Sequence, residues 1–462
     1  MFPPEVYQAR RQALQKRLGS GLLLFPGGSQ SPRNFADNTY PFRQDSSFLY
    51  YFGIPIPGVA AVIDPAAGTS TLFMARPGMM DLVWTGAEVQ PEEWRDRAGM
   101  DRVKDIKELP GCLSAVPKEH IHYLPPFRTD TRVALHRLGN IPLDLVDREA
   151  SIDLVQAVIS QRAIKEAREI AQIKQAIAIS RECYRKLLQR TAPGMTTGML
   201  KGFIDEILAA HGSCHAFAPI ITTHGEVLHH GAENAPIRAG DMVLVDAGAE
   251  SAEGYAADIT RTFPAANRFS SRQREIYQVV LNAQQAAIAA IRPGITYLAV
   301  HRQACIKIAE GLRQLGLLRG NMHEAVEAGA HALFFVHGLG HFLGLDAHDM
   351  ESLGEDRVGY APEQTRSPQF GLASLRLART LETGFCLTVE PGLYFIPRLI
   401  DLWQAEKRCA RFINYGAIEA FRGLGGIRIE DDVLVTPQGA EVLSPIPRKA
   451  EDIEKIRSTR RL

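Results

Sequence analysis

The chain has 462 residues, of which 52 are Lys or Arg and 52 are Asp or Glu, so its formal net charge is zero. At roughly 100–200 residues per domain, a chain of this length predicts two or three domains. The balanced charge argues against a nucleic-acid-binding protein, because such proteins carry a basic surplus that neutralises phosphates. With 45% apolar and 23% charged residues, the composition is that of an ordinary folded protein with a sizeable core.

The chain shows no sequence signal for secretion or membrane insertion. Its N-terminal stretch, MFPPEVYQARRQALQKRL, lacks the apolar core of a signal peptide. The longest uncharged apolar stretch, residues 48–63, is interrupted by glycines and prolines and is too short to cross a bilayer. The six cysteines are scattered without a CxxC pair, which indicates reduced thiols rather than a disulfide framework. We therefore expect a cytoplasmic protein that does not enter membranes.

Residues 1–155 are predicted to form an α/β domain. The sequence GLLLF (residues 21–25) is typical of a short buried strand. Residues 60–63 and 69–74 predict two further strands around the turn sequence DPAAG. From residue 161 onward, apolar residues recur at helical spacing with charged residues between them. This pattern indicates a long amphipathic helix near the start of a second domain, residues 156–462.

The second domain contains an internal repeat. Residues 193–196 (PGMT) stand between two helical patterns, and one hundred residues later residues 293–296 (PGIT) do the same. Each half then reaches a predicted strand that ends in an acid, at Asp246 and at Glu390, six residues after a glycine and directly after a valine. The repeat predicts a pseudo-twofold domain in which the two carboxylates converge between the halves. The alternative is a chance recurrence of common residues.

A second acid accompanies each of these two. Asp258 opens the strand pattern ITRTF twelve residues after Asp246, and two antiparallel strands would bring both acids to one face. On these two residues alone, a turn cap at Asp246 and an ion pair of Asp258 with Arg261 is the simpler interpretation. Glu430 lies in IRIEDDVLV (residues 427–435), where alternation predicts one strand, and an exposed strand face is the alternative for its side chain.

The most unusual segment is HGLGHFLGLDAHD (residues 337–349). Its three glycines exclude a stable helix and let the backbone pass close to a ligand. His337, His341 and His348 fall within twelve residues among small and apolar neighbours. This favours ligand or acid–base chemistry over the alternative, a structural role.

Four carboxylates and one imidazole could together hold metal, and they belong to Asp246, Asp258, His341, Glu390 and Glu430. This oxygen-rich set suits hard or borderline dications, so we expect two divalent ions, Mn²⁺ first, with Co²⁺ or Zn²⁺ as alternatives. Two neighbouring dications can ionise a bridging water at neutral pH and polarise a carbonyl, which hydrolyses an amide without a covalent intermediate. No serine stands in a nucleophile-elbow context, so a covalent route has less support.

The chain resembles the pita-bread metallopeptidases, and within them the prolidase and aminopeptidase P group. The matching stretches, in the family's order, are LVDAG (244–248), DITRTF (258–263), HGLGHFLGLDAHD (337–349), LTVEPGLYF (387–395) and GIRIEDDVLVT (426–436). FRQDSSFLYYFG (42–53) is similar to the N-terminal domain that accompanies these peptidases. The resemblance implies an α+β fold in which an N-terminal aminopeptidase P-like domain precedes a pseudo-twofold catalytic domain. It also implies hydrolysis of Xaa-Pro bonds by a hydroxide that bridges the two ions.

The resemblance further implies a role for each metal ligand. Asp258 and Glu430 would bridge both ions, Asp246 would bind one of them, and His341 with Glu390 would bind the other. Glu390 would also shuttle a proton, a task that suits a carboxylate between a metal and a water.

Substrate-side positions follow from the same resemblance. His229, His337 and His348 would hydrogen-bond the scissile carbonyl, the developing oxyanion or the proline end of the substrate. Arg376 resembles the arginine that captures a dipeptide's free carboxylate, a bidentate task that suits guanidinium. The alternative for Arg376 is an ordinary surface arginine.

Two more residues complete the implied substrate-binding group. Arg428 resembles an arginine that stands beside the last metal ligand. Trp84 resembles a tryptophan that reaches a neighbouring subunit's active site in family oligomers, which implies a homodimer or homotetramer. An ordinary half-buried tryptophan is the alternative for Trp84.

The leading functional hypothesis is an Xaa-Pro dipeptidase (prolidase) that acts on small peptides. Arg376 favours it, and so do residues 397–421, which resemble an insertion of longer prolidases. The runner-up is Xaa-Pro aminopeptidase (aminopeptidase P), acting on longer peptides. A non-catalytic pita-bread binding protein is disfavoured because all five ligand positions are filled. Residues 221–226 (ITTHGE) depart from a family stretch rich in Gly, Ser, Glu and Asn, which leaves the shape of the substrate pocket open.

Overall fold

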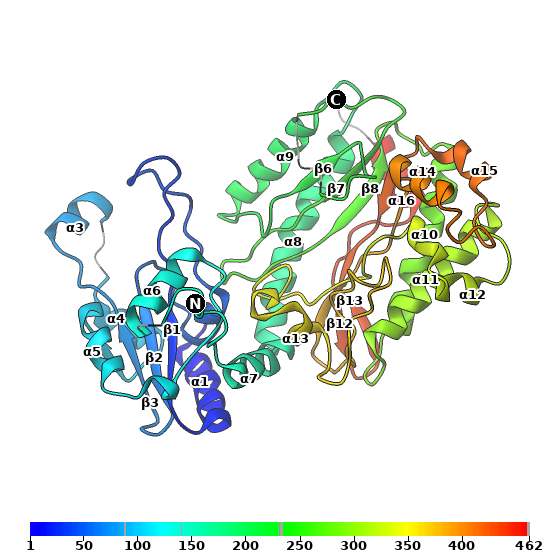
Figure 1. Cartoon of the computed structure of the whole chain (residues 1–462). Coiled ribbons are helices and arrows are strands. Elements are labelled where there is room, and N and C mark those ends of the chain that lie inside the picture. The colour runs from blue at the N-terminus through cyan, green and yellow to red at the C-terminus, as the bar shows by residue number, and fades with distance from the viewer. Residues whose placement is uncertain (87–88, 140, 230, 232–233, 460–462) are drawn as a thin grey trace. The chain divides into compact units, whose positions relative to one another are not determined.

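The computed structural model describes residues 1–86, 89–139, 141–229, 231 and 234–459 (Figure 1). The chain separates into two compact units. The first consists of Met1–Arg162 with Met350–Gly354, and the second of Ala163–Asp349 with Glu355–Leu462. The predicted boundary near residue 155 falls within helix α7 (Ile152–Ala163).

The first unit is built on a five-stranded sheet of order β4-β3-β2-β1-β5. The strands are β1 (Leu22–Pro26), β2 (Ala60–Asp64), β3 (Thr69–Phe73), β4 (Arg102–Lys104) and β5 (Ile121–Tyr123). β2 pairs antiparallel with β1 and β3, whereas β4 and β5 add in parallel at the two edges. The three strands predicted in this region are therefore confirmed, because a buried apolar run bounded by turn residues is a strong local signal.

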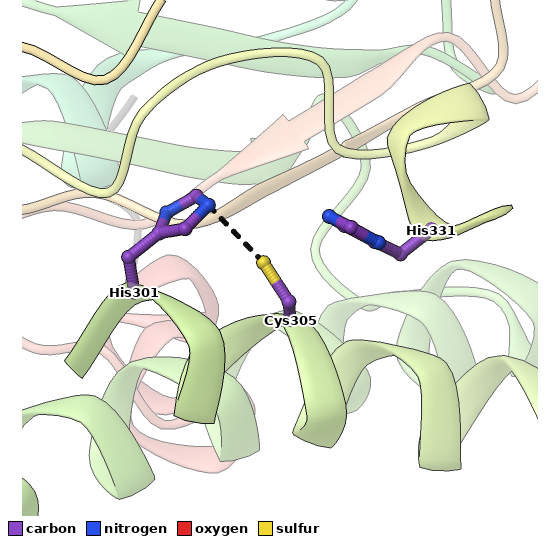
Figure 2. Close-up of side chains that lie close together, drawn as sticks. All are labelled: His301, Cys305 and His331. Carbon is purple, nitrogen blue, oxygen red and sulfur yellow. Dashed lines mark hydrogen bonds between the residues drawn. The ribbon is translucent and has the colours of Figure 1, made fainter. Parts of the chain in front are cut away.

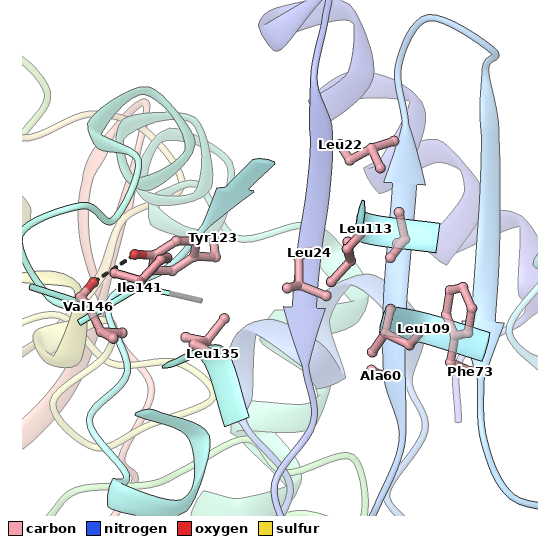
Figure 3. Packing of buried hydrophobic residues seen from close by; sticks show 11 residues of the cluster. Leu22, Leu24, Ala60, Phe73, Leu109, Leu113, Tyr123, Leu135, Ile141 and Val146 are labelled. Carbon is pink, nitrogen blue, oxygen red and sulfur yellow. Dashed lines mark hydrogen bonds between the residues drawn. The ribbon is translucent and has the colours of Figure 1, made fainter. Parts of the chain in front are cut away.

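The first unit also contains helices. They are α1 (Pro4–Leu18), α2 (Ser46–Phe52), α3 (Met79–Thr85), α4 (Pro91–Arg97), α5 (Leu109–Ser114), α6 (Thr129–Gly139) and α7. Figure 3 shows Leu24 of β1 beside Leu113 of α5, in a cluster of buried apolar side chains. Full burial of one leucine contributes about 1.5–3 kcal/mol, so this cluster stabilises the contact between the sheet and α5. Tyr123, the polar member of the cluster, donates its hydroxyl to the carbonyl of Val146 at 2.9 Å.

The second unit contains three small antiparallel sheets, β6-β7-β8, β13-β12-β9 and β10-β11. The strands are β6 (Ile220–Thr222), β7 (Met242–Asp246), β8 (Thr260–Pro264), β9 (Cys386–Val389), β10 (Gly392–Tyr394), β11 (Gly426–Arg428), β12 (Asp431–Thr436) and β13 (Gly439–Val442). Every residue of β7, β8 and β9 is buried, including the polar residues of β8.

Two long helix pairs flank these strands in Figure 1, α8 with α9 and α10 with α11. The helices of the unit are α8 (Ala167–Arg190), α9 (Thr197–Ala210), α10 (Ser271–Ala290), α11 (Tyr297–Gln314), α12 (Met322–Glu327), α13 (Glu355–Gly359), α14 (Pro397–Ala405), α15 (Tyr415–Ile418) and α16 (Ala450–Ser458). None of the helices in the described ranges is long and apolar enough to span a membrane.

The predicted repeat is present in this unit. The hydroxyls of Thr196 and Thr296 cap α9 and α11, each accepting a hydrogen bond from a backbone amide three residues on. The preceding glycines, Gly194 and Gly294, have φ angles of +90° and +85°, a region that glycine enters without strain. The same turn and cap thus start the second helix of both halves, as a pseudo-twofold domain requires.

Candidate metal centre and substrate pocket

The first two acids meet at the end of a β-hairpin. Asp246 is the last residue of β7 and lies opposite Thr260, the first residue of β8, while Asp258 precedes β8 by two residues. The antiparallel pairing predicted for these strands is confirmed. Gly248 lets the connection close, because a Cβ there would lie 1.6 Å from the carbonyl oxygen of Ala257.

The other two acids leave a second strand pair. β9 pairs with β12 so that Val389 lies opposite Asp431. Glu390 directly follows Val389, and Glu430 directly precedes Asp431. Both glutamates therefore stand at the same end of the strand pair. Glu430 also joins the two halves of the unit, since its amide donates to the carbonyl of Thr260 at 3.0 Å.

The single strand predicted for residues 427–435 is wrong. β11 ends at Arg428 and β12 begins at Asp431, and these strands belong to different sheets. The backbone leaves the ladder between them, because the amide of Ile429 donates to Pro391 and that of Glu430 to Thr260. Glu430 is buried rather than on an exposed strand face, so the alternative reading of this residue is also wrong.

The glycine-rich segment runs beside β9. The amide of Glu390 donates to Leu339 at 2.8 Å, and that of Thr388 donates to His341 at 3.0 Å. A Cβ on Gly340 would lie 2.1 Å from the carbonyl oxygen of Thr388. Gly340 therefore lets two backbone segments lie close together. The sequence had predicted instead that this glycine lets the backbone pass close to a ligand. This pairing places the imidazole of His341 beside the carboxylate of Glu390.

His341 is oriented as a neutral ligand. Its Nδ1 lies 3.0 Å from the carbonyl of Phe342, which can only accept, so Nδ1 carries the proton. Nε2 faces the acids, 3.6 Å from Asp258 Oδ2 and 3.5 Å from Glu390 Oε1. Burial lowers the pKa of His341 well below its usual value, which keeps the ring neutral. A fixed tautomer with its other nitrogen directed at carboxylates is typical of a metal-ligating histidine.

The structure brings all five predicted ligand residues together, in two groups that share one member. Asp246, Asp258 and Glu430 can each offer one oxygen within 4.8 Å of the others. A ring nitrogen of His341 and one oxygen each from Glu390 and Glu430 lie equally close together. Burial, followed by the neighbouring carboxylates, raises the pKa values of Asp258 and Glu430 well above normal. Burial also raises the pKa of Glu390 to about 7.

The buried carboxylates of this group have too little positive charge near them to balance their own negative charge. Oδ1 of Asp246 is buried and has no hydrogen-bond partner, which is costly for a carboxylate oxygen. Crowded buried carboxylates repel each other unless cations lie between them. The donor set of oxygens with one imidazole therefore fits hard or borderline divalent ions.

A chain of hydrogen bonds supports the first group. Arg428 donates to Asp246 Oδ2 at 2.6 Å, to the hydroxyl of Thr260 at 3.1 Å and to that of Tyr394 at 3.1 Å. Tyr394 in turn lies 2.8 Å from Nε2 of His337, whose Nδ1 lies 2.8 Å from the carbonyl of Gly338. Sequence reasoning missed Tyr394 and Thr260, although both stand inside the motifs LTVEPGLYF and DITRTF.

The carboxylates open into a pocket of about 580 Å³. Its lining includes the predicted substrate-side residues His229, His337, His348, Arg376 and Arg428. Arg376 therefore lies at the pocket, and its Nε is 3.8 Å from Glu355 Oε2. The ring of His348 lies 4.1 Å from that of His341. Trp84 belongs to α3 in the first unit and is 77% exposed, so it is not the half-buried tryptophan of the alternative interpretation.

Comparison with known proteins identifies both parts of the chain. Residues 171–437 match metallopeptidase family M24, and residues 7–122 match the aminopeptidase P N-terminal domain. The chain is 34% identical to the Xaa-Pro dipeptidase of Homo sapiens over 98% of this chain and 93% of that protein. It is 33% identical to the Xaa-Pro aminopeptidase of Escherichia coli strain K12, over 97% of both. Zinc-substituted aminopeptidase P of Escherichia coli in complex with product superposes with a TM-score of 0.82 at 30% identity, covering 100% of this chain and 99% of that one.

Proposed function

The chain belongs to metallopeptidase family M24, and we propose that it is an Xaa-Pro dipeptidase that works with two divalent metal ions, Mn²⁺ foremost. It is a metallopeptidase of the kind that cleaves Xaa-Pro bonds, since relatives with this activity match nearly its whole length. The single observation that carries the proposal is the convergence of four carboxylates and one imidazole at the floor of a pocket that Arg376 lines.

Each ligand has a proposed place in the centre. Asp258 and Glu430 would bridge the ions, Asp246 would hold one of them, and His341 with Glu390 would hold the other. When bound, such ions activate water as a nucleophile and polarise the scissile carbonyl. Thr260 supports this arrangement, because its hydroxyl donates to Glu430 Oε2 at 2.7 Å and limits the orientations of that carboxylate.

Glu390 is the proposed proton carrier. Of the two acids whose oxygens lie near Nε2 of His341, Glu390 has the more exposed side chain, and it lines the pocket. Its Oε2 also lies 3.9 Å from Nδ1 of His337. A carboxylate at that place can take the proton of the attacking water and deliver it to the proline nitrogen. His229 and His348 line the same pocket and would hydrogen-bond the substrate carbonyl as charge develops on it.

In this proposal, Arg376 makes the enzyme prefer dipeptides to longer peptides. A dipeptide ends in a carboxylate directly after proline, and a guanidinium at the pocket wall can bind it with two parallel hydrogen bonds. A longer peptide presents an uncharged amide at that point. The Xaa-Pro aminopeptidase remains the second candidate, because the similarity to such an enzyme is as complete as the similarity to the dipeptidase.

Three matched peptides test this choice on metal-loaded protein: Xaa-Pro, its amide Xaa-Pro-NH₂ and Xaa-Pro-Yaa-Yaa. A dipeptidase cleaves the first fastest, whereas equal or better cleavage of the tetrapeptide would establish the aminopeptidase instead. Arg376→Ala should raise KM for Xaa-Pro but leave KM for the amide unchanged. Arg411→Ala, which removes an exposed arginine paired with Glu324, is the control.

We also propose that the protein is a homodimer or homotetramer. Helix α3 exposes Met79, Met80, Val83 and Trp84, which together form an apolar surface. Light scattering of the wild type and of Trp84→Ala tests this, since the substitution should shift the protein toward smaller species. An unchanged monomeric mass for both proteins would contradict the proposal.

A further inference from the structure

Three side chains with metal-binding atoms meet away from the catalytic pocket. His301 and Cys305 are one helical turn apart on α11, so they share a face, and His331 faces them from the short 3₁₀ helix η3 (Ala330–Leu333) (Figure 2). One ligand atom from each lies within 4.8 Å of the other two, and Nε2 of His301 is 3.3 Å from Sγ of Cys305. None of the three lines the pocket that holds the carboxylates.

These polar groups are buried but incompletely satisfied. The exposed fractions of His301, Cys305 and His331 are 1%, 1% and 2%. Nδ1 of His301 and Nδ1 of His331 are both buried without a hydrogen-bond partner. A buried ring nitrogen without a partner is costly, so each ring carries a polar atom that the surrounding protein does not satisfy.

The protonation states suit a ligand set. Burial lowers the pKa of His301 to about 3 and that of His331 to about 4, so both rings are neutral and offer a lone pair. Burial raises the pKa of the Cys305 thiol, so in the absence of an ion it stays protonated. A bound dication reverses this preference, because thiolate is the form that ligates metal and its proton passes to water.

The geometry points to a second, structural metal site: we propose that His301, Cys305 and His331 bind one Zn²⁺ or a similarly soft dication. Zinc takes imidazole nitrogen at about 2.0–2.1 Å and thiolate sulfur at about 2.3 Å in tetrahedral sites, which places a nitrogen and a sulfur ligand about 3.5 Å apart. The observed Sγ to Nε2 distance of 3.3 Å is close to that separation. The oxygen-rich catalytic set suits harder ions, so the two sites differ in the metal they select.

Such an ion would tie α11 to the segment that carries catalytic residues. η3 ends at Leu333, and the chain reaches His337 four residues later and His341 after four more. Phe335 packs its ring 5.5 Å from that of His301, between η3 and the glycine-rich segment. The site would thus stabilise the approach of this segment without touching the substrate.

Cobalt tests the proposal because thiolate gives Co²⁺ a near-ultraviolet charge-transfer band that carboxylate and imidazole do not give. The full-length protein is produced in medium supplied with Co²⁺, so that the ion is present while this buried site forms. We expect the band in the wild type and in Asp258→Ala, whose catalytic centre is impaired. Its presence in that variant separates this site from the proposed peptidase centre.

Two variants and a control test whether Cys305 supplies the sulfur ligand. Cys305→Ser and His331→Ala should lose the band and about one ion per chain. Cys183→Ser should keep both, because Cys183 is another buried thiol, on α8 and outside the cluster. A cobalt-loaded wild type without the band, or a band that persists in Cys305→Ser, would overturn the proposal. The wild-type measurement decides even if a variant fails to fold.

Discussion

Arg428 donates a hydrogen bond of 2.6 Å from Nη2 to Oδ2 of Asp246, while Oδ1 of the same carboxylate is buried without a hydrogen-bond partner. The arginine therefore fixes one oxygen and leaves the other available to a cation. The same guanidinium also holds Thr260 and Tyr394, so one side chain orients groups from both halves of the unit. Its planar fork makes these contacts possible, and an ammonium could not reproduce them.

Replacing this arginine should weaken the metal centre, because its guanidinium holds one oxygen of the predicted ligand Asp246. We expect Arg428→Lys to reduce metal affinity or kcat by about 10–100-fold, as is typical when a group that orients a ligand is lost. KM should change little, and excess Mn²⁺ should restore part of the activity. Competition with a chelator measures the affinity, and Arg411→Ala is the control. Unchanged metal affinity together with a raised KM would contradict the positioning role.

The two proposed bridging acids should be indispensable. Asp258→Ala or Glu430→Ala removes an oxygen shared between the ions and should abolish peptide hydrolysis, because both ions then lose their spacing. Asp401→Ala, on an exposed aspartate paired with Arg422, should leave the rate unchanged. Steady-state kinetics on folded variants provides the test. More than about a tenth of the wild-type activity in either bridging variant would argue against a shared centre.

Metal removal should inactivate the protein reversibly. A chelator is expected to abolish activity and lower Tm, since the buried carboxylates then repel each other without compensating charge. Added Mn²⁺ should restore both properties, and Co²⁺ or Zn²⁺ provides the comparison. Circular dichroism confirms that the chelated sample is folded. If no divalent ion restored such a sample, metal catalysis would be excluded.

The ion pair of Lys165 with Asp349 should be important for stability. Their charged atoms are 3.0 Å apart, and each side chain is only 1% exposed. Lys165→Met leaves a buried carboxylate without its cation, which should lower the free energy of unfolding by about 3–5 kcal/mol.

An exposed pair provides the control for this prediction. Lys201→Met breaks an ion pair with Asp205 near the surface and should cost less than about 1 kcal/mol. Urea denaturation of both variants measures the difference. Equal losses would show that burial does not set the strength of the Lys165 pair.

Local patterns in the sequence were sufficient for several elements of this site. The hairpin of β7 and β8 follows from two strand patterns that each border an acid, and the repeat follows from two PGxT turns. The single strand predicted across Ile429 and Glu430 is wrong, because contacts with distant parts of the chain decide the backbone conformation there. Alternation continues through these residues, but their amides bond to Pro391 and Thr260, which lie far away in the chain.

By itself, the sequence determined which residues could bind metal and which strands would carry them, because ligand chemistry and short-range periodicity are properties of neighbouring residues. Only the tertiary structure decided which of these side chains meet. It directs Nε2 of His341 at Asp258 and Glu390, and it sets His331 against His301 and Cys305. The physical reason is that pairing between distant strands and packing between distant helices depend on the whole fold, which no local pattern encodes.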